Sequence, residues 1–546
     1  MQANNNGGRR TWMMIPLVAL GLAAGLSMAL LVALHGGAQA HASARAQDRA
    51  QAVFPDPAGS GISDSDSDNG GGGGKGQGQG KRDEVVGAVI TRPNDFLGNW
   101  QIAVNSLTVL TVVVDADTKI QKFKDLPALG EWVEVRGTTQ AAGSVLAQRL
   151  RPSKFESGEV VVRLNASGTI TDVADRYKLT LIDTLLSSAN IYLFASEDAI
   201  EEDAILKEMG KDPGIEWAEL NYVSQTPSDT EGHPYRTWKW GSSDPSGYTN
   251  HVAFQQVHLL PAEARYGGSG VIVAVLDTGI DAAHPALSGR LLPGRDLVND
   301  DDVPQDGPEA GEAAGLVQGH GTHVSGIIAR IAPQSKLLPL RVLDVNGRGN
   351  TYVLAYAIEW AVDHGADVIN LSLGSEFDSS VLGSAIAAAQ ARGVVIVAAA
   401  GNDDVETPQY PANFPGVLGV TAVDENDHKA PFANYGAAAV DLAAPGVGIT
   451  STVPLSGEIA YAAWSGTSMA TPFVSGAAAL VKEQQPDASV ATITEQLIAA
   501  GGDLDTANPQ YVGQLGRMLD IAAALHIPDD TPGASIHYLY LPALGR

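Results

Sequence analysis

Three short motifs, far apart in the chain, carry side chains that together could perform nucleophilic catalysis. They are Asp-Thr-Gly at 277–279, His-Gly-Thr-His at 320–323 and Gly-Thr-Ser-Met-Ala at 466–470. A serine hydroxyl is a weak nucleophile until a neighbouring base takes its proton, and histidine suits that task because its pKa lies near neutrality. A carboxylate that accepts the other imidazole N–H fixes the tautomer and stabilises the imidazolium. We therefore predict Asp277 as the orienting carboxylate, His320 as the general base and Ser468 as the nucleophile.

The sequence around each motif predicts the element that positions it. Residues 271–276 form a continuous apolar, β-branched run, which is typical of a strand buried on both faces. This run ends at Asp277, so the carboxylate is expected at the C-terminal edge of a sheet, where α/β proteins place their sites. His320 opens a segment with helical apolar spacing, and Ser468 starts an Ala- and Gly-rich helix with Pro472 in its first turn. A serine near a helix N-terminus lies in a field that favours developing negative charge.

The chain order Asp, His, Ser resembles that of the subtilisin-like serine proteases, the subtilase family. Singly, each motif has an ordinary structural explanation: a turn after a strand, a packed histidine, a capping serine. All three in order, each in the expected context, favour the catalytic interpretation. The resemblance implies an α/β fold over residues 255–527, with a parallel sheet and helices on both faces. It also implies that the protein is an enzyme that hydrolyses peptide bonds in proteins through an acyl-enzyme.

Two further stretches extend the resemblance. The apolar run 394–400 leads into Gly-Asn, and Asn402 matches the asparagine whose side-chain amide binds the oxyanion in the family. The alternative for Asn402 is an ordinary turn residue. Residues 369–374 resemble the strand that binds substrate backbone and lines the primary specificity pocket, where an extended peptide would add as a β-strand. The substrate-binding residues implied there are Ser372, Leu373 and Gly374.

Side chains before the Tyr-Pro pair at 410–411 bear on specificity, because this segment resembles one near the specificity pocket. Asp403, Glu406 and Gln409 precede it. An acidic rim could accept basic substrate residues, whereas broad specificity for apolar or aromatic residues is the alternative that we favour. Reporter peptides containing Phe or Arg distinguish the two.

Calcium binding is where the sequence departs from subtilisins proper. Those proteins insert a calcium loop in the helix after the catalytic histidine and use an aspartate where this chain has Ala286; residues 324–330 here run on without an insertion. Residues 296–305 instead resemble the calcium loop of thermitase-like members, and their oxygens suit a hard cation. The implied ligands are Asp296, Asp301 and Gln305 with the carbonyl of Val303. The alternative is a merely solvated acidic loop. No cofactor is expected for the chemistry itself.

The N-terminus carries a targeting segment. Two arginines precede an apolar run from about 12 to 34, and Ala-Gln-Ala follows at 38–40 as a cleavage candidate. The run is nearly long enough to span a bilayer, so residues 1–44 are a signal peptide or a membrane anchor, with cleavage and export favoured. The expected location is extracellular; the alternative is a membrane-tethered protein with the protease outside the cytoplasm. Residues 45–84, rich in Gly, Asp and Ser, are predicted to be a flexible linker.

Two small domains are predicted between the linker and the protease. Residues 85–152 contain β-type runs separated by turn residues, which predicts a β-rich, barrel-like module that binds a ligand or surface, or serves in folding or spacing. Residues 158–225 resemble the inhibitory split-βαβ propeptide of subtilases; the alternative is a permanent accessory domain. In the family the propeptide tail lies in the substrate cleft and is cut by the enzyme itself. The resemblance thus implies a maturation region at 226–254, and residues 528–546 are predicted to be a C-terminal tail.

Composition limits the partners. The 546-residue chain has 34 Lys and Arg against 62 Asp and Glu and no cysteine. Disulfides are therefore excluded, and the acidic balance argues against nucleic acid as a partner. We expect a monomer whose partners are protein or peptide substrates and its own propeptide, with membrane contact only through the N-terminal apolar segment. A second class of function stays open: the protein could be an adhesion or scaffolding protein that binds through the 85–152 module and uses the protease fold as a platform.

Overall fold

The computed structural model describes residues 83–105, 108–120, 126–127, 132–140, 143–196, 202–226, 239–240, 243–307, 317–456 and 459–527. The chain divides into two units, 1–73 and 74–546, and every described residue lies in the second. The predicted targeting segment 1–44 and tail 528–546 lie outside the described residues, as does nearly all of the predicted linker. The last two linker residues, Asp83 and Glu84, instead open a strand. Among the described helices, none has the length and apolar character needed to cross a membrane.

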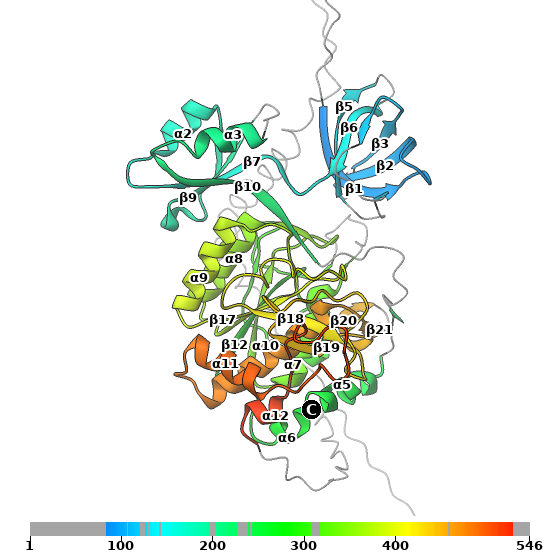
Figure 1. The fold of residues 1–546 in the computed structure, drawn as a ribbon, viewed down its shortest axis with the longest axis vertical. Helices are drawn as coiled ribbons and strands as arrows, with labels where there is room; N and C mark the ends of the chain where they lie inside the picture. Colours follow the sequence, from blue (N-terminus) through cyan, green and yellow to red (C-terminus); the bar gives the residue numbers. More distant parts are fainter. Residues whose placement is uncertain are drawn as a thin grey trace, which may run out of the picture. The chain divides into compact units, whose positions relative to one another are not determined.

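The first described domain is a small closed β-barrel (Figure 1). Its strands run in the order β3-β2-β1-β5-β6, and a parallel pairing between β3 and β6 closes the ring. Trp100, Ile102, Val133, Val135 and Leu150 fill the interior and are fully buried. The predicted barrel-like module is thus confirmed. The strands are β1 (Asp83–Thr91), β2 (Gly98–Asn105), β3 (Thr108–Val114), β4 (Lys119–Ile120), β5 (Trp132–Thr139) and β6 (Val145–Pro152).

The second domain is a mixed α/β unit with two helices on one face of a sheet. Its own strands run in the order β10-β7-β9-β8. Alternate residues of β7 point to opposite sides: Val160 and Val162 pack with the two helices, and Val161 joins the core that contains α8 (Thr351–Asp363) of the third domain. The elements are β7 (Phe155–Leu164), α2 (Ile170–Tyr177), β8 (Thr180–Asp183), β9 (Ile191–Ala195), α3 (Glu202–Met209) and β10 (Ile215–Gln225), with a 3-10 turn at Ser187–Ala189.

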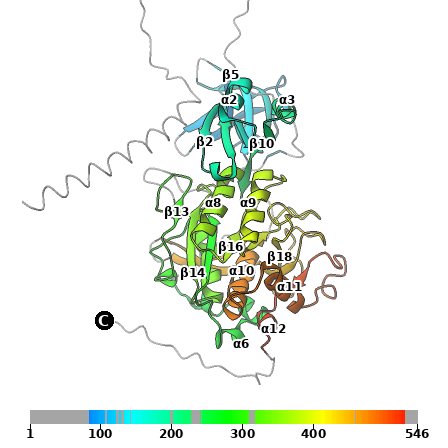
Figure 2. The same cartoon turned by 90° about the vertical axis from the view of Figure 1, so that its left-hand side faces the viewer.

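The third domain is built on a parallel sheet with the order β13-β14-β12-β16-β17-β18-β19-β22 (Figure 2). Each of its strand pairings is parallel. The strands are β12 (Ile272–Asp277), β13 (Arg295–Asp296), β14 (Lys336–Arg341), β16 (Val368–Leu371), β17 (Val395–Ala399), β18 (Leu418–Val423), β19 (Leu442–Pro445) and β22 (Arg517–Met518).

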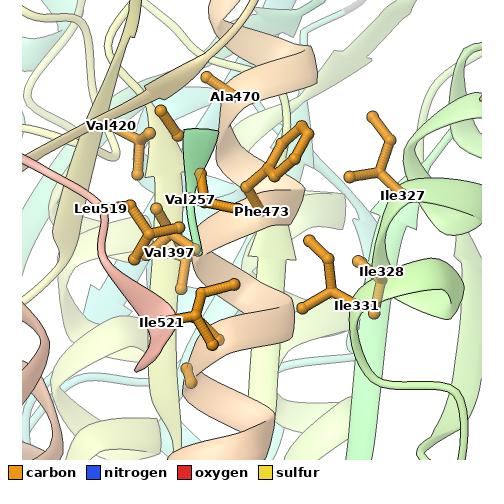
Figure 3. Close-up of a cluster of buried hydrophobic side chains, with 14 of the residues drawn as sticks. Val257, Ile327, Ile328, Ile331, Val397, Val420, Ala470, Phe473, Leu519 and Ile521 are labelled. Carbon is orange, nitrogen blue, oxygen red and sulfur yellow. The ribbon is translucent and has the colours of Figure 1, made fainter. Parts of the chain in front are cut away.

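Helices cover both faces of this sheet, as predicted. Along β12, Val273 and Val275 belong to one apolar core, and Ala274 and Leu276 belong to the other. The first core lies under α7 and α10, where Figure 3 shows isoleucines of α7 gathered near Phe473 of α10. The second lies under α8 and α9. The main helices are α7 (His320–Ile331), α8 (Thr351–Asp363), α9 (Ser380–Ala391), α10 (Thr467–Gln484) and α11 (Val490–Ala500).

Shorter elements complete the domain. They are β11 (Lys239–Trp240), α4 (Ser246–Thr249), α5 (Val252–Gln256), α6 (Leu259–Glu263), β15 (Arg348–Asn350), β20 (Ile449–Ser456), β21 (Ile459–Trp464), α12 (Ile521–Ala524) and a 3-10 turn at Pro285–Leu287. Much of the predicted maturation region, 227–238 and 241–242, lies outside the described residues. The end of this region is not a linker, because Ala253 and Phe254 are buried in the core of the third domain.

Candidate active site

Asp277 and His320 meet at the C-terminal edge of the sheet. Asp277 is the last residue of β12 and His320 the first of α7, and the Nδ1–H of His320 donates to Oδ1 of Asp277 at 2.7 Å. Both side chains are buried. Gly321 permits this approach, because a Cβ there would lie 3.1 Å from the Cβ of Asp277 and closer still to the carbonyl oxygen of Gly279. This geometry sets the imidazole tautomer that leaves Nε2 able to accept a proton.

A second buried carboxylate, Asp306, ties these two segments together. Its Oδ1 accepts from the hydroxyl of Thr278 at 3.0 Å and the N–H of Gly319 at 2.9 Å. Its Oδ2 accepts from the N–H of Thr322 at 2.9 Å and the hydroxyl of Thr322 at 2.6 Å. Burial raises the pKa of Asp306 to about 6; these donors oppose the rise, and the charge of Asp277 adds to it. Sequence reasoning missed Asp306, because a lone loop aspartate carries no distinguishing pattern.

Ser468 lies in the first turn of α10, close to Ser372, the residue that follows β16. Its hydroxyl donates to the carbonyl oxygen of Ser372 at 3.2 Å, and the hydroxyl of Ser372 donates to the carbonyl oxygen of Ser468 at 3.0 Å. Both residues are buried. Because β12, β16 and β17 are adjacent in the sheet, the residues that follow them are brought together at one edge.

Asn402 follows β17 and is oriented by the residue that precedes Ser468. Its Oδ1 accepts from the N–H and from the hydroxyl of Thr467, both at 2.9 Å. Its Nδ2 lies 3.4 Å from the position a Cβ on Gly466 would take, which places the amide at the N-terminus of α10. An amide N–H and a helix N-terminus together suit a developing oxyanion.

Hydrogen bonds of Asn434 hold the turn that carries Asn402. Sequence reasoning also missed Asn434. The Oδ1 of Asn434 accepts from the N–H of Asp403 at 2.8 Å and of Val405 at 3.3 Å. Its Nδ2 donates to the carbonyl oxygen of Ala400 at 3.0 Å, and its backbone N–H to that of Gly401 at 2.9 Å. Asn434 is 1% exposed, so these hydrogen bonds are shielded from water.

The predicted substrate-binding segment already holds a strand. Gly374 and Gln225 exchange two backbone hydrogen bonds, of 2.9 and 2.8 Å, in an antiparallel bridge. The same end of β10 pairs with β15 on its other side. β16 itself ends at Leu371, earlier than the predicted strand, because residues beyond it leave the parallel sheet. The Leu373 side chain is buried in the core under α8 and α9, so only its backbone can face a peptide.

Two side chains of β10 cap helices α8 and α9 of the third domain. The carboxylate of Glu219 accepts from the hydroxyl of Ser379 at 2.8 Å and from the N–H groups of Ser380 at 2.6 Å and Val381 at 3.0 Å, at the start of α9. Burial raises the pKa of Glu219, and these donors counter that rise. The Oδ1 of Asn221 accepts from the N–H of Tyr352 at the start of α8, at 3.1 Å. Helix N-termini favour such acceptors.

The predicted calcium loop is held by its own hydrogen bonds. The Oδ1 of Asp296 accepts from the N–H groups of residues 298 and 299, and its Oδ2 pairs with Arg341 at 2.9 Å. The Oδ1 of Asp301 accepts from the N–H of Val303, whose carbonyl accepts from the N–H of Gln305, both at 2.7 Å. The described residues contain no cluster of three or more His, Asp or Glu able to hold a metal. Oxygens of Asp296, Asp301 and Val303 thus already accept hydrogen bonds within the loop, and calcium binding there stays a prediction.

The structure thus places an Asp–His pair and a serine in the first turn of a helix at one edge of a parallel sheet that has helices on both faces. The subtilase family matches residues 268–514, and a domain of unknown function (DUF5666) matches residues 97–151. The chain is 40% identical over 295 residues to the thermophilic serine proteinase of Bacillus sp. (strain AK1), covering 52% of this chain and 67% of that one. It is 43% identical over 232 residues to thermitase of Thermoactinomyces vulgaris, covering 41% of this chain and 78% of thermitase.

A solved structure shows the same relationship. The match to fervidolysin of Fervidobacterium pennivorans, described as a keratinolytic enzyme related to subtilisin, has a TM-score of 0.58 and 25% identity. It covers 70% of this chain and 62% of fervidolysin. The chain belongs to the subtilase family and is a subtilisin-like serine endopeptidase, related to thermitase. The predicted family, fold class and enzyme class are confirmed.

Proposed function

We propose that this protein is secreted as a zymogen and hydrolyses peptide bonds through an acyl-enzyme on Ser468. The observation that carries the proposal is the 2.7 Å hydrogen bond from His320 to Asp277, at the sheet edge where Ser468 lies in the first turn of α10. Ser468 attacks the substrate carbonyl while its proton passes to Nε2 of His320, and Asp277 stabilises the imidazolium. The oxyanion accepts from the amide of Asn402 and the N–H of Ser468. His320 then protonates the leaving amine, and water releases the acyl group by the same path in reverse.

The substrate is proposed to bind as an extended strand between residues 348–350 and 372–374. The end of β10 supports this, because Val223–Gln225 already pair with β15 on one side and Gln225 pairs with Gly374 on the other. Backbone pairing of this kind is independent of substrate side chains. It therefore suits an enzyme that cuts many proteins.

The zymogen proposal treats residues 158–225 as an inhibitory propeptide. Its support is the occupied substrate segment together with the helix caps made by Glu219 and Asn221. Since β10 runs antiparallel to residues 372–374, the chain leaves Thr226 in the direction of Ser372 and Ser468. We propose that the maturation cut lies in 226–254, towards its N-terminal end. The 85–152 module would then leave with the propeptide.

Secretion is proposed from the N-terminal apolar run followed by Ala-Gln-Ala at 38–40. Expression in a secreting host tests it: protein in the medium with an N-terminus near residue 41 supports a cleaved signal. Full-length protein that stays in the membrane fraction supports the tethered alternative.

The nucleophile is tested by labelling with a sulfonyl fluoride, which modifies an activated serine. Peptide mapping should find the adduct on Ser468 alone and should find none in a His320→Ala variant. Labelling at another serine, or labelling that survives loss of His320, would contradict the assignment.

A further inference from the structure

A buried ion pair joins the turn that carries Asn402 to a segment further along the chain. The Nζ of Lys429 donates to Oδ1 of Asp404 at 2.7 Å and to the carbonyl oxygen of Ala430 at 3.1 Å. The Lys429 side chain is 2% exposed, whereas that of Asp404 is 48% exposed. Asp404 follows Asn402 closely and has a left-handed backbone, with a φ of 54°. A charge that is shielded from water is thus held against the turn 402–405.

Two tyrosine rings cover the ammonium of Lys429. The ring centroids of Tyr435 and Tyr511 lie 5.2 and 5.0 Å from its Nζ, and the two rings meet edge to face with 4.8 Å between their centroids. Cation–π contacts of this kind favour the charged amine. Burial lowers the pKa of Lys429, and the hydrogen bond and charge of Asp404 oppose that change. Because a buried charge that loses its partner is strongly unfavourable, the ammonium and the Asp404 carboxylate hold each other in place.

The backbone of Lys429 is fixed as well. Its N–H donates to Oδ1 of Asn508 at 2.7 Å, and Asn508 is 5% exposed. The Nδ2 of Asn508 donates to the carbonyl oxygens of Asp427 at 2.8 Å and Leu504 at 2.9 Å. Lys429 therefore provides a fixed point for the turn, in contrast to a lysine whose side chain moves freely in water.

The segment 429–435 contacts the turn through the main chain and through this charge. The N–H of Asp404 donates to the carbonyl oxygen of Phe432 at 2.8 Å, while its carboxylate accepts from Lys429. Within the turn, the Oδ1 of Asn402 accepts from Thr467, and its Nδ2 is the proposed oxyanion donor. Displacement of a catalytic group by about 1 Å can cost about 10² in rate. Small movements of the turn should therefore change kcat.

We propose that Lys429 is a positioning residue for the oxyanion donor. Its ammonium holds the carboxylate of Asp404, which fixes the turn 402–405 and hence the place of the Asn402 amide. Lys429 acts through Asp404 and not on the substrate itself. The proposal rests on the proposed function, because it requires Asn402 to bind the oxyanion.

Lys429→Met tests this role, because methionine has a similar length and no charge. It should lower kcat on a neutral reporter peptide by about tenfold and leave KM within about twofold, since a displaced amide keeps part of the factor of about 10²–10³ that an oxyanion donor contributes. Asp404→Asn should have an effect of similar size. The double variant should be no slower than either single variant, because both changes remove the same ion pair. Rates are measured well below the Tm of each variant.

Two comparisons complete the test. In an Asn402→Ala background, Lys429→Met should have little further effect on kcat, because the amide that it positions is absent. The control is Lys336→Met, at the exposed start of β14, where the Nζ donates to the carbonyl oxygen of Gly289. It should leave kcat unchanged. Should Lys429→Met fail to fold, Asp404→Asn decides alone.

The outcomes separate the positioning role from the proposed function. An unchanged kcat in the ion-pair variants, a loss confined to KM, or the same fold-loss with and without Asn402 overturns the positioning role. A reduced kcat in Asn402→Ala upholds the proposed function in each of these cases. If Asn402→Ala is itself as active as wild type, the proposed oxyanion donor and the positioning role fail together.

Discussion

The carboxylate of Asp306 accepts both the N–H and the hydroxyl of Thr322, two residues into the helix that His320 begins. Through its other oxygen it also holds Thr278, the neighbour of Asp277. Asp306 is thus a positioning residue, because it fixes the two segments whose ends form the Asp277–His320 pair without itself facing the reacting atoms.

The raised pKa of Asp306 gives the first prediction, a pH-dependent stability. Its folded-state pKa of about 6 lies above the ordinary value of 3.8, so the folded state binds more protons than the unfolded state between these values. This group's stabilising contribution is therefore full below pH 3.8 and is lost as pH rises through 6, by about 3 kcal/mol in all. Urea unfolding of Ser468→Ala protein at pH 4 to 7, with and without Asp306→Asn, measures it. Identical pH slopes in the two proteins would refute the assignment.

Activity should fall in mild acid. Proton transfer needs neutral His320, so kcat/KM on an uncharged peptide should drop about tenfold per pH unit below the pKa of the free enzyme's base. The second histidine of the His-Gly-Thr-His motif does not titrate in this pH range, since burial lowers the pKa of His323 to about 3. An activity maximum near pH 4 would contradict His320 as the base.

Removal of the oxyanion amide should reduce turnover rather than binding. Asn402→Ala is expected to lower kcat by about 10²–10³ with little change in KM, the range found when such a donor is removed from a subtilisin. Asn426→Ala, in an exposed turn, serves as the control. A loss confined to KM would show that Asn402 binds substrate in its ground state instead.

Calcium at residues 296–305 remains a prediction from the resemblance. If it binds, calcium should raise the Tm of Ser468→Ala protein, and Asp301→Ala should abolish that rise. Asp302→Ala, which removes an exposed partner of Arg295, should retain it. No calcium-dependent shift in the parent protein would contradict calcium binding and leave a loop stabilised by its own hydrogen bonds and the Asp296–Arg341 pair.

The sequence predicted the parts of this molecule whose signals are local. Apolar runs that end at Asp277 and before Asn402, and glycines that frame His320 and Ser468, all lie within a few residues of the side chain they position. Helices α8 and α9 also begin at local signals, because the side chains of Asn350 and Ser379 cap them.

Long-range partners were not predictable in the same way. Asp306 and Asn434 act through groups that are distant in sequence, and an aspartate or an asparagine in a loop is usually solvated. The parallel pairing of β3 with β6 likewise joins residues more than thirty positions apart. Leu373 shows another limit of the sequence: its segment is predicted to bind substrate, but its side chain belongs to the core.

The most direct test compares the chain without residues 1–44 with its Ser468→Ala twin, by intact mass and casein hydrolysis. The account predicts that wild type shortens to a fragment beginning within 226–254 and digests casein, while the twin stays whole and inert. Maturation of the twin to the same fragment, or casein hydrolysis by it at the wild-type rate, would contradict the central claim that Ser468 is the nucleophile.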